Sequence, residues 1–378
     1  MIYLDNAATS FPKPDSVREA ILACMREAGG NPGRSSHRLA RRASEVVFRT
    51  RQTLAELLGV GLSERIVFTA NATEALNLAI KGILSPGDHV ITTSLEHNAV
   101  VRPLHSLVRR GLELTTIRTN GGPIDPNEVR RAIKSNTRLL VTLFASNVTG
   151  TVMPVREIGE IARANEIPYL VDAAQAAGAV SINLAELPVD LLAFTGHKAL
   201  LGPMGTGGLY IAEGIDIEPL KEGGTGSDSP SPLQPEALPD RFEAGTLNVP
   251  GIAGLGAAAQ YILERGSDAI MREKLSLSHR LEEALCEIPR VRIHSVTGAS
   301  KRIAITSMTV DGMDSQEVAY RFDRDFDICV RGGLHCAPDA HKSIGTFPEG
   351  TVRFSPGPFT TEENVDAAIK AVRRLATG

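Results

Sequence analysis

Residues 167–198, IPYLVDAAQAAGAVSINLAELPVDLLAFTGHK, hold the pattern that decides the fold. Their two short apolar runs, 167–171 and 190–194, are bounded by Pro, Asp and Gly, and each has the length of a strand covered on both faces. The other runs of this kind are 65–69, 88–93, 138–145 and 207–211. The helical stretches that alternate with the runs are 73–83, 99–110, 126–134 and 155–165. This alternation predicts an α/β fold with a mostly parallel, doubly wound sheet.

Beyond residue 250 the sequence predicts a smaller α+β domain. Residues 251–288 read as a long helix that is broken near Gly266. The elements expected after it are strands at 291–294, 303–310 and 326–330, a helix at 314–324 and a terminal helix from about 361. The stretch 223–240, GGTGSDSPSPLQPEALPD, is rich in Gly, Ser and Pro and predicts an exposed loop before the boundary.

The composition argues against several classes of protein. Forty Lys and Arg oppose 44 Asp and Glu among 378 residues, and a net charge of −4 lacks the basic excess of a nucleic-acid-binding protein. No apolar run approaches the roughly 18 residues of a membrane-spanning helix, and Asp5 stands where a secretory leader is apolar. We therefore expect a cytoplasmic protein without membrane contact. The four cysteines form no C-x-x-C pair, so we expect neither a disulfide scaffold nor a metal site.

The densest cluster of reactive side chains lies between residues 168 and 210. Asp172 follows a predicted strand, which places its carboxylate at the C-terminal edge of the sheet, where ligands bind in open α/β folds. Lys198 follows the next strand, in a Gly-containing turn. A lone lysine in such a turn is more often a solvated surface residue. Together, a lysine that can bond to an aldehyde and a carboxylate that can keep a ring nitrogen protonated indicate pyridoxal phosphate.

Other strand ends add groups suited to the same cofactor. Residues 69–77 join a predicted strand to a helix, which places backbone N–H groups and the Thr73 hydroxyl to bind a phosphate. The same stretch is also an ordinary helix start, with Asn71 or Thr73 as the capping residue. His97 and Asn147 each follow a predicted strand, and an imidazole at this edge can stack on a cofactor ring. The convergence of these groups predicts one pocket.

These residues resemble those of cysteine desulfurases, in the class V aminotransferase branch of the fold-type I pyridoxal phosphate enzymes. The matching segments, in the family's order, are YLDNAAT (3–9), NATEALNLAI (71–80), EHNAV (96–100), SNVTGT (146–151), VDAAQA (171–176), GHKALLGPMGTGGLYI (196–211), RFEAGTLN (241–248), RGGLHCAP (331–338) and GTVRFSPGPFTTEENVD (350–366). The short loop around Cys336 is similar to that of the compact-loop subtype, which is selenocysteine lyase-like. The resemblance implies a large pyridoxal-phosphate-binding domain at 15–250, and a small domain at 1–14 and 251–378 that carries this loop.

The resemblance also implies a role for each matching residue. Lys198 bears the cofactor and takes part in catalysis, Asp172 pairs with the ring nitrogen, and Gln175 bonds to the ring hydroxyl. His97 stacks on the ring and contributes to catalysis. The residues implied to hold the phosphate are Thr73, Thr195, His197, the backbone of Ala72, and Thr246, which reaches the phosphate of the partner subunit in a homodimer with shared sites. Those implied to surround the substrate are Arg353, which binds its carboxylate, Asn147, which also contacts the cofactor, and the neighbours Arg331 and His37.

Cys336 is implied to be the nucleophile. It lies in a loop beside Arg331 and two glycines, where an exposed and reactive thiol is expected. Cys24, Cys286 and Cys329 lie in amphipathic or apolar stretches and are expected to be buried. The implied reaction converts L-cysteine to L-alanine and leaves the sulfur on Cys336 as a persulfide. A protein acceptor then takes the sulfur, and its further use, such as iron–sulfur cluster assembly, stays open.

Three alternatives stay open as well. A selenocysteine lyase, which acts on L-selenocysteine, has almost the same site. An aminotransferase or a C–S lyase would use pyridoxal phosphate without Cys336. A non-catalytic sulfur carrier or scaffold is the third, and the joint presence of Lys198, Asp172, Gln175, Cys336 and Arg353 speaks against it.

Overall fold

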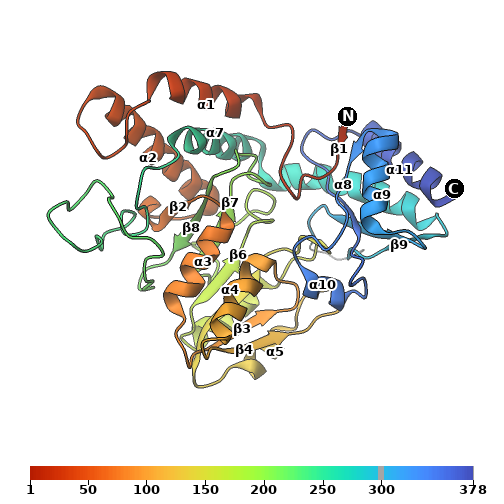
Figure 1. Cartoon of the computed structure of the whole chain (residues 1–378), viewed down its shortest axis with the longest axis horizontal. Coiled ribbons are helices and arrows are strands. Elements are labelled where there is room, and N and C mark those ends of the chain that lie inside the picture. Colours follow the sequence, from red (N-terminus) through yellow and green to blue (C-terminus); the bar gives the residue numbers. More distant parts are fainter. Residues whose placement is uncertain (297–301, 378) are drawn as a thin grey trace.

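A computed structural model describes residues 1–296 and 302–377 of the chain (Figure 1). A large β-sheet lies between helices on both of its faces, and a smaller α+β part, coloured cyan to blue, lies beside it. Both ends of the chain lie in this smaller part. The predicted α/β class, with a large doubly wound domain and a small C-terminal domain, is confirmed.

The large sheet has seven strands among the described residues and is mixed. In spatial order they are β2 (Ile66–Thr69), β8 (Gly207–Ile211), β7 (Leu191–Thr195), β6 (Tyr169–Asp172), β5 (Thr137–Leu143), β3 (His89–Thr93) and β4 (Glu113–Ile117). The pairs that involve β8 are antiparallel and the other pairs are parallel. The sequence predicts every strand except β4, because this edge strand is partly exposed and its residues, ELTTI, form no apolar run.

The direction of β8 has a consequence for the site. Because β8 runs opposite to both β7 and β2, strand β2 points the same way as the parallel strands. The C-terminal ends of β2, β3, β5, β6 and β7 therefore meet at one edge of the sheet. In open α/β sheets this edge is where ligands bind.

Alternation along the strands builds a core on each face of the sheet. In β7, Leu192 and Phe194 belong to one core, and Leu191 and Ala193 to the other; all four are fully buried. The helices over the first face are α1 (Asp15–Glu27), α2 (Arg38–Leu58), α5 (Pro126–Ala132), α6 (Val155–Ala164) and α7 (Val249–Arg265). Those over the second face are α3 (Ala72–Ile83) and α4 (Asn98–Val108). Helices on both faces make the sheet doubly wound.

The small domain contains an antiparallel three-stranded sheet in the described part of the chain. Its strands, in spatial order, are β12 (Val352–Phe354), β10 (Thr306–Val310) and β9 (Val291–Ile293). The helices of this domain are α8 (Ser267–Cys286), α9 (Ser315–Phe326), α10 (Pro338–Ser343) and α11 (Glu362–Thr377). Gly266, with φ 81°, separates α7 from α8 where the break is predicted.

Two short strands tie the N-terminus to this domain. The strand expected at 326–330 is β11 (Ile328–Cys329), which pairs in parallel with β1 (Ile2–Tyr3) rather than with the three-stranded sheet. The third strand of that sheet is β12, which the sequence does not predict because three residues carry no periodicity.

The expected division between domains stays a prediction. Leu4 lies in the core of the small domain, together with α9 and α11. Helix α7, which the division assigns to the small domain, packs instead against α1 and α2 of the large one. Residues 223–240, all of which the structure describes, form neither helix nor strand and are mostly exposed, as expected for a surface loop.

Candidate active site

One cavity lies at the sheet edge where the five strand ends meet. Residues from the ends of all five strands, or from the turns after them, line it. The predicted site residues that line it are Ala72, Thr73, His97, Asn147, Asp172, Gln175, Thr195, His197 and Lys198. The fold therefore brings together the residues expected to surround the cofactor.

One end of the cavity is bounded by the start of α3. Asn71 is the N-cap, since its Oδ1 accepts a 3.0 Å hydrogen bond from the Glu74 N–H. Thr73 is thus free of the capping role, and it lies exposed on the cavity wall. Gly207 of β8 passes so close that a Cβ there would lie 2.7 Å from Asn71 Cα, which only glycine allows. The result is a helix start that presents unpaired N–H groups and a hydroxyl to an anion.

Two buried polar atoms near this helix start have no hydrogen-bond partner among the described residues. They are Thr195 Oγ1 and His197 Nδ1. Burial, with further contributions from the charges of Lys198 and Lys13, lowers the pKa of His197 to about 4, so its ring is neutral near pH 7. An unpaired buried polar group costs about 1–3 kcal/mol. Both atoms therefore indicate a ligand with oxygen atoms at this end of the cavity.

Lys198 and Asp172 are the charged groups of the cavity. Burial lowers the pKa of Lys198 to about 8; the charge of Asp172 opposes this shift and that of Arg353 adds to it. Roughly a tenth of the Lys198 amine is then neutral at pH 7, far more than for an exposed lysine. Burial raises the pKa of Asp172, against a 2.9 Å hydrogen bond that Oδ1 accepts from the Ala174 N–H and against the Lys198 charge. A neutral amine at this position is a nucleophile toward an aldehyde.

His97 and Gln175 are held by bonds to the backbone. His97 is the N-cap of α4, and its Nδ1 accepts a 3.0 Å hydrogen bond from the Ala99 N–H, which fixes the ring. Burial, then Lys198 and nearby arginines, lowers the pKa of His97 to about 4. A neutral imidazole suits stacking on an aromatic ring. Gln175 Nε2 donates a 2.9 Å hydrogen bond to the Ala7 carbonyl oxygen, which fixes its amide at the cavity wall.

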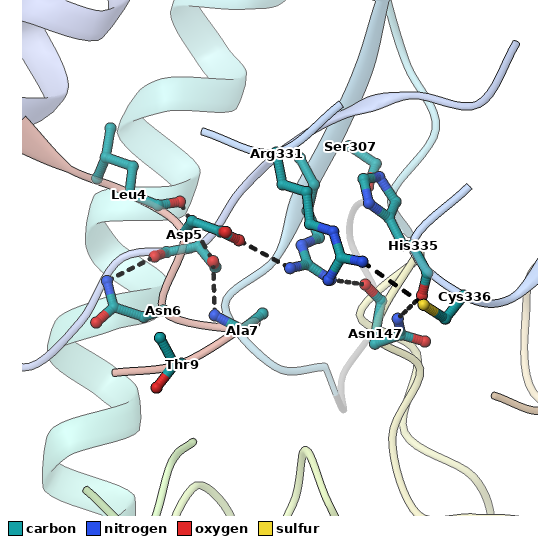
Figure 2. A network of polar contacts seen from close by, with 12 residues as sticks. Leu4, Asp5, Asn6, Ala7, Thr9, Asn147, Ser307, Arg331, His335 and Cys336 are labelled. Atoms are coloured by element: carbon teal, nitrogen blue, oxygen red, sulfur yellow. Dashed lines mark hydrogen bonds and ion pairs between the residues drawn. The ribbon is translucent and has the colours of Figure 1, made fainter. Parts of the chain in front are cut away.

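A network of polar contacts joins the cavity to the small domain (Figure 2). Arg353 is fully buried on β12; its Nη1 donates a 3.0 Å hydrogen bond to the Asn147 carbonyl oxygen. Its Nη2 forms a 2.9 Å ion pair with Asp5. The Asn147 side chain donates a 2.8 Å hydrogen bond to the carbonyl oxygen of His335, next to Cys336. The network thus links Arg353 to the cysteine loop.

The loop of Cys336 is anchored to the large domain by its backbone. The Asn98 N–H, adjacent to His97, donates a 2.7 Å hydrogen bond to the Cys336 carbonyl oxygen. His335 and Cys336 both adopt left-handed backbone angles, with φ 49° and 59°, which costs non-glycine residues of order 1 kcal/mol each. The thiol itself is exposed, as expected, and Arg331 Nη2 lies 3.6 Å from its Sγ.

The other cysteines differ in burial. Cys24 is buried on α1, as expected. Cys329 is half-buried. The expectation that Cys286 is buried is wrong: this residue is exposed, because it is the last residue of α8 and the buried stripe of that helix ends at Leu285.

Two predicted site residues, Thr246 and His37, do not line the cavity. Thr246 is exposed, and its Oγ1 accepts a 3.2 Å hydrogen bond from Asn31 Nδ2. His37 is the exposed N-cap of α2, where its Nδ1 accepts a 3.3 Å hydrogen bond from the Ala40 N–H. Neither residue is among those that line the cavity in the described part of this chain.

The sequence does not indicate that three further residues belong to the site. Asp5 pairs with Arg353, and Asn98 binds the cysteine loop. Glu96 is fully buried, and its Oε1 accepts hydrogen bonds from the Thr93 hydroxyl and from the N–H of Leu143, a residue of the cavity wall. Asp5 and Asn98 belong to segments that match the family, YLDNAAT and EHNAV, but no local pattern shows their partners.

The residues around the cavity fit pyridoxal phosphate. The unpaired Thr195 and His197 atoms and the start of α3 suit its phosphate. The buried carboxylate of Asp172 suits the ring nitrogen, and the amine of Lys198 suits the aldehyde. One cavity therefore offers a matching group to each functional part of the cofactor.

Residues 2–368 match the model of the class-V aminotransferase family, and the chain belongs to this family. The chain is similar over its full length to cysteine desulfurases. It is 34% identical to a probable cysteine desulfurase of Methanothermobacter thermautotrophicus, with 99% of this chain and 94% of the relative covered. It is 37% identical to the cysteine desulfurase IscS of Methanosarcina thermophila, with 99% and 91% covered.

Solved structures give the same result. An apo structure of the cysteine desulfurase from Thermococcus onnurineus NA1 superposes with a TM-score of 0.93 at 35% identity. The match covers 100% of this chain and 95% of the solved chain. The crystal structure of the cysteine desulfurase CsdA from Escherichia coli gives 0.89 at 28% identity, with 98% and 94% covered. The predicted family and fold are confirmed, and so is the cofactor, because the family depends on pyridoxal phosphate.

Residues 1–296 and 302–377 lack two features, a membrane-spanning helix and a cluster of metal ligands. In these residues every helix is too short or too polar to cross a membrane. They also contain no group of three His, Cys, Asp or Glu side chains arranged to hold a metal ion.

Proposed function

We propose that this chain is a pyridoxal-phosphate-dependent cysteine desulfurase that converts L-cysteine to L-alanine and receives the sulfur on Cys336. The observation that carries the proposal is that Lys198 and Asp172 share one cavity, while the backbone of the exposed Cys336 is bonded to Asn98, the residue after His97 of the cavity wall. Full-length relatives at 34% and 37% identity are named as cysteine desulfurases, which supports the same activity.

The large domain holds the cofactor. Thr73, Thr195, His197 and the backbone of Ala72 bind its phosphate, and Gln175 binds its ring hydroxyl, with Asn147 beside it. Asp172 keeps the ring nitrogen protonated, and the neutral ring of His97 stacks on the cofactor. When bound, pyridoxal phosphate supplies an aldehyde that joins to amines and a ring that accepts electron density.

The other residues bind the substrate and move protons. Arg353 binds the substrate carboxylate in a fork of N–H donors, assisted by Asn147, with Arg331 and His37 as further neighbours. Lys198, as a neutral amine, takes the proton from the substrate Cα and returns it as a general acid. Its lowered pKa, about 8, suits both roles near neutral pH.

Cys336 receives the sulfur. Its thiolate, beside the Arg331 guanidinium, forms a bond to the substrate sulfur as the Cβ–S bond breaks. The carbon takes a proton and leaves as L-alanine, and Cys336 keeps the sulfur as a persulfide. A protein acceptor collects the sulfur in a later step.

The assembly is part of the proposal. We infer a cytoplasmic homodimer in which Thr246, which is exposed and does not line its own cavity, reaches the phosphate of the partner subunit. The compact-loop subtype and the two-domain division also belong to the proposal. Sedimentation of the purified protein tests the dimer.

The activity is tested by giving L-cysteine to the purified, cofactor-loaded protein and measuring L-alanine. Mass spectrometry of the denatured protein then looks for one added sulfur atom on the peptide that contains Cys336. The proposal predicts L-alanine and the added sulfur together. Absence of L-alanine, or its formation with sulfur bound elsewhere, contradicts it.

A further inference from the structure

The N-terminal segment, residues 4–10, pairs with Ser355, the residue that follows strand β12. Asp5 pairs in parallel with Ser355, the Asn6 N–H donates a 3.2 Å hydrogen bond to the Ser355 carbonyl oxygen, and the Ser355 N–H donates one of 2.7 Å to that of Leu4. The Ala7 N–H bonds to Ser355 Oγ at 2.9 Å. This pairing holds the Asp5 carboxylate at Arg353, two positions before Ser355 (Figure 2).

The same segment also contacts the cofactor side of the site. The Ala7 carbonyl oxygen accepts the 2.9 Å hydrogen bond from Gln175 Nε2. The carbonyl oxygen of His197 accepts hydrogen bonds from the Ser10 N–H at 2.8 Å and from the Thr9 hydroxyl at 3.1 Å. One short stretch of chain therefore joins β12, the turn after β6 and the Lys198 turn.

Arg353 needs a counter-charge at its position. Its side chain is fully buried, and it lies opposite Arg331 in an antiparallel bridge, closed by a 2.8 Å hydrogen bond from the Arg353 N–H to the Arg331 carbonyl oxygen. Burial and the Arg331 charge lower the pKa of Arg353, and the Asp5 carboxylate opposes them. The positive charges of Arg353 and Arg331 repel each other, and a buried charge is stable only when it is paired with an opposite charge. Asp5 supplies that pairing.

The two bonds to Arg353 also fix the plane of its guanidinium. Asp5 accepts from Nη2 and the Asn147 carbonyl oxygen accepts from Nη1, so both ends of the fork are held. A guanidinium has five N–H donors, and Nε of Arg353 is buried with no partner among the described residues. Donors thus stay available in a fixed plane, which is what a bidentate carboxylate requires.

We propose that Asp5 is a positioning residue for substrate recognition: its carboxylate orients Arg353, so that the guanidinium receives the substrate's α-carboxylate in one geometry. This inference rests on the proposed function, because the carboxylate is that of the amino acid substrate. Asp5 acts through Arg353 and touches neither the reacting sulfur nor Cα.

The test measures the equilibrium binding of two amines to the cofactor-loaded protein. The absorbance of the bound cofactor is the signal that reports binding. L-alanine carries the α-carboxylate, and ethylamine is the same molecule without it. The variants are Asp5→Ala, which removes the anchor, and Asp5→Asn, which keeps an oxygen that can accept from Nη2. Tyr3→Phe is the matched control, because the Tyr3 hydroxyl bonds to the carbonyl oxygens of Asp5 and Thr9 and not to the carboxylate.

We expect Asp5→Ala to weaken L-alanine binding roughly tenfold or more and to leave ethylamine binding unchanged, as loss of a hydrogen bond to a charged group implies. Asp5→Asn keeps an acceptor for Nη2 but loses the counter-charge, so its L-alanine affinity should lie between those of the wild type and Asp5→Ala, with ethylamine binding unchanged. Tyr3→Phe stays within about threefold of the wild type for both ligands. In turnover, Asp5→Ala raises KM for L-cysteine by a similar factor and changes kcat less.

The inference is overturned if Asp5→Ala binds L-alanine as the wild type does, or if it loses affinity for both amines equally. If Asp5→Ala does not fold, Asp5→Glu gives the same test, because a longer side chain displaces the carboxylate from its place against Nη2. These outcomes are separate from the activity itself. A wild-type protein that forms no L-alanine from L-cysteine contradicts the proposed function, whereas the two binding constants address Asp5 alone.

Discussion

The two ends of the candidate site are built in different ways. At the cofactor end, Asp172 and Thr195 are the last residues of two neighbouring strands and Lys198 lies in the turn after the second, all within 27 residues of sequence. At the substrate end, Asp5 and Arg353 meet across 348 positions, and Asn147 bonds to His335 across 188. The first arrangement follows from the order of the strands. The second exists only after the N-terminal segment and the small domain have docked on the large one.

The two ends therefore have different roles: the cofactor end carries out the chemistry, and the substrate end recognises the substrate. The cofactor end has buried groups with shifted pKa values and unpaired polar atoms, which are signs of a site that binds a ligand and reacts. At the substrate end Arg353 also has a shifted pKa and an unpaired Nε, but its charge is paired with Asp5, and this ion pair fixes a geometry. Changes at the first end should therefore remove activity or cofactor, and changes at the second should alter substrate selection.

The largest expected effect comes from Lys198→Ala. Loss of the only proton carrier that we place at the substrate Cα should slow L-alanine formation by about a thousandfold or more, since general acid–base catalysis alone contributes about 10²–10⁴. Phosphate contacts remain, so the variant should still bind the cofactor. Rates and cofactor absorbance check both points. A variant that keeps a tenth of the wild-type rate would place the proton transfer on another residue.

The pKa of Lys198 predicts how pH affects cofactor loading. Because only the neutral amine attacks the aldehyde, the rate at which apoprotein bonds to pyridoxal phosphate should rise about tenfold per pH unit below pH 8 and level off above it. Stopped-flow absorbance between pH 6 and 10 measures this. A rate that keeps rising up to pH 10 would show an amine with the pKa of an exposed lysine.

Thr195→Val should change the affinity for the cofactor without changing the stability of the apoprotein. The Thr195 hydroxyl has no partner among the described residues, so its loss should not destabilise the apoprotein. Loss of a hydrogen bond to a charged phosphate should weaken cofactor binding about tenfold. Equilibrium dialysis and apoprotein melting temperature test this pair of outcomes. Unchanged affinity with reduced apoprotein stability would refute the phosphate assignment.

Glu96 should affect the pH dependence of stability rather than the reaction. Burial raises its pKa to about 8, although the Thr93 hydroxyl and the Leu143 N–H oppose the shift. From about pH 4.5 to 8 the folded protein keeps this proton while the unfolded chain has lost it, so rising pH favours unfolding by up to about 1.4 kcal/mol per unit. Glu96→Gln lacks this dependence.

The stability of Glu96→Gln relative to the wild type should therefore increase from pH 5 to pH 8 and change no further above that. Urea unfolding at several pH values measures the difference. A constant difference across this range would mean that Glu96 is ionised in the folded protein.

The sequence predicts most of the large domain for a physical reason. Its strands are buried on both faces and read as apolar runs, and the groups that follow them share one edge by the geometry of parallel strands. The role of Cys336 and Arg353 comes from the family resemblance, since a short loop and a three-residue strand carry no periodicity.

Other features escape sequence reasoning because they depend on contacts between distant segments. The pairing of Asp5 with Arg353, the bond from Asn98 to the cysteine loop and the exposure of Cys286 are of this kind. Thr246 and His37 mark a further limit, since the roles implied for them lie outside the cavity of their own chain.

The central claim is that sulfur passes to Cys336, and Cys336→Ser tests it most directly. Wild type and variant, both loaded with pyridoxal phosphate, receive L-cysteine, and L-alanine and sulfide are quantified. We predict that the variant binds the cofactor normally and forms L-alanine at no more than about a hundredth of the wild-type rate, because the serine hydroxyl does not replace a thiolate as the nucleophile toward sulfur. L-alanine formation at the wild-type rate would contradict the mechanism.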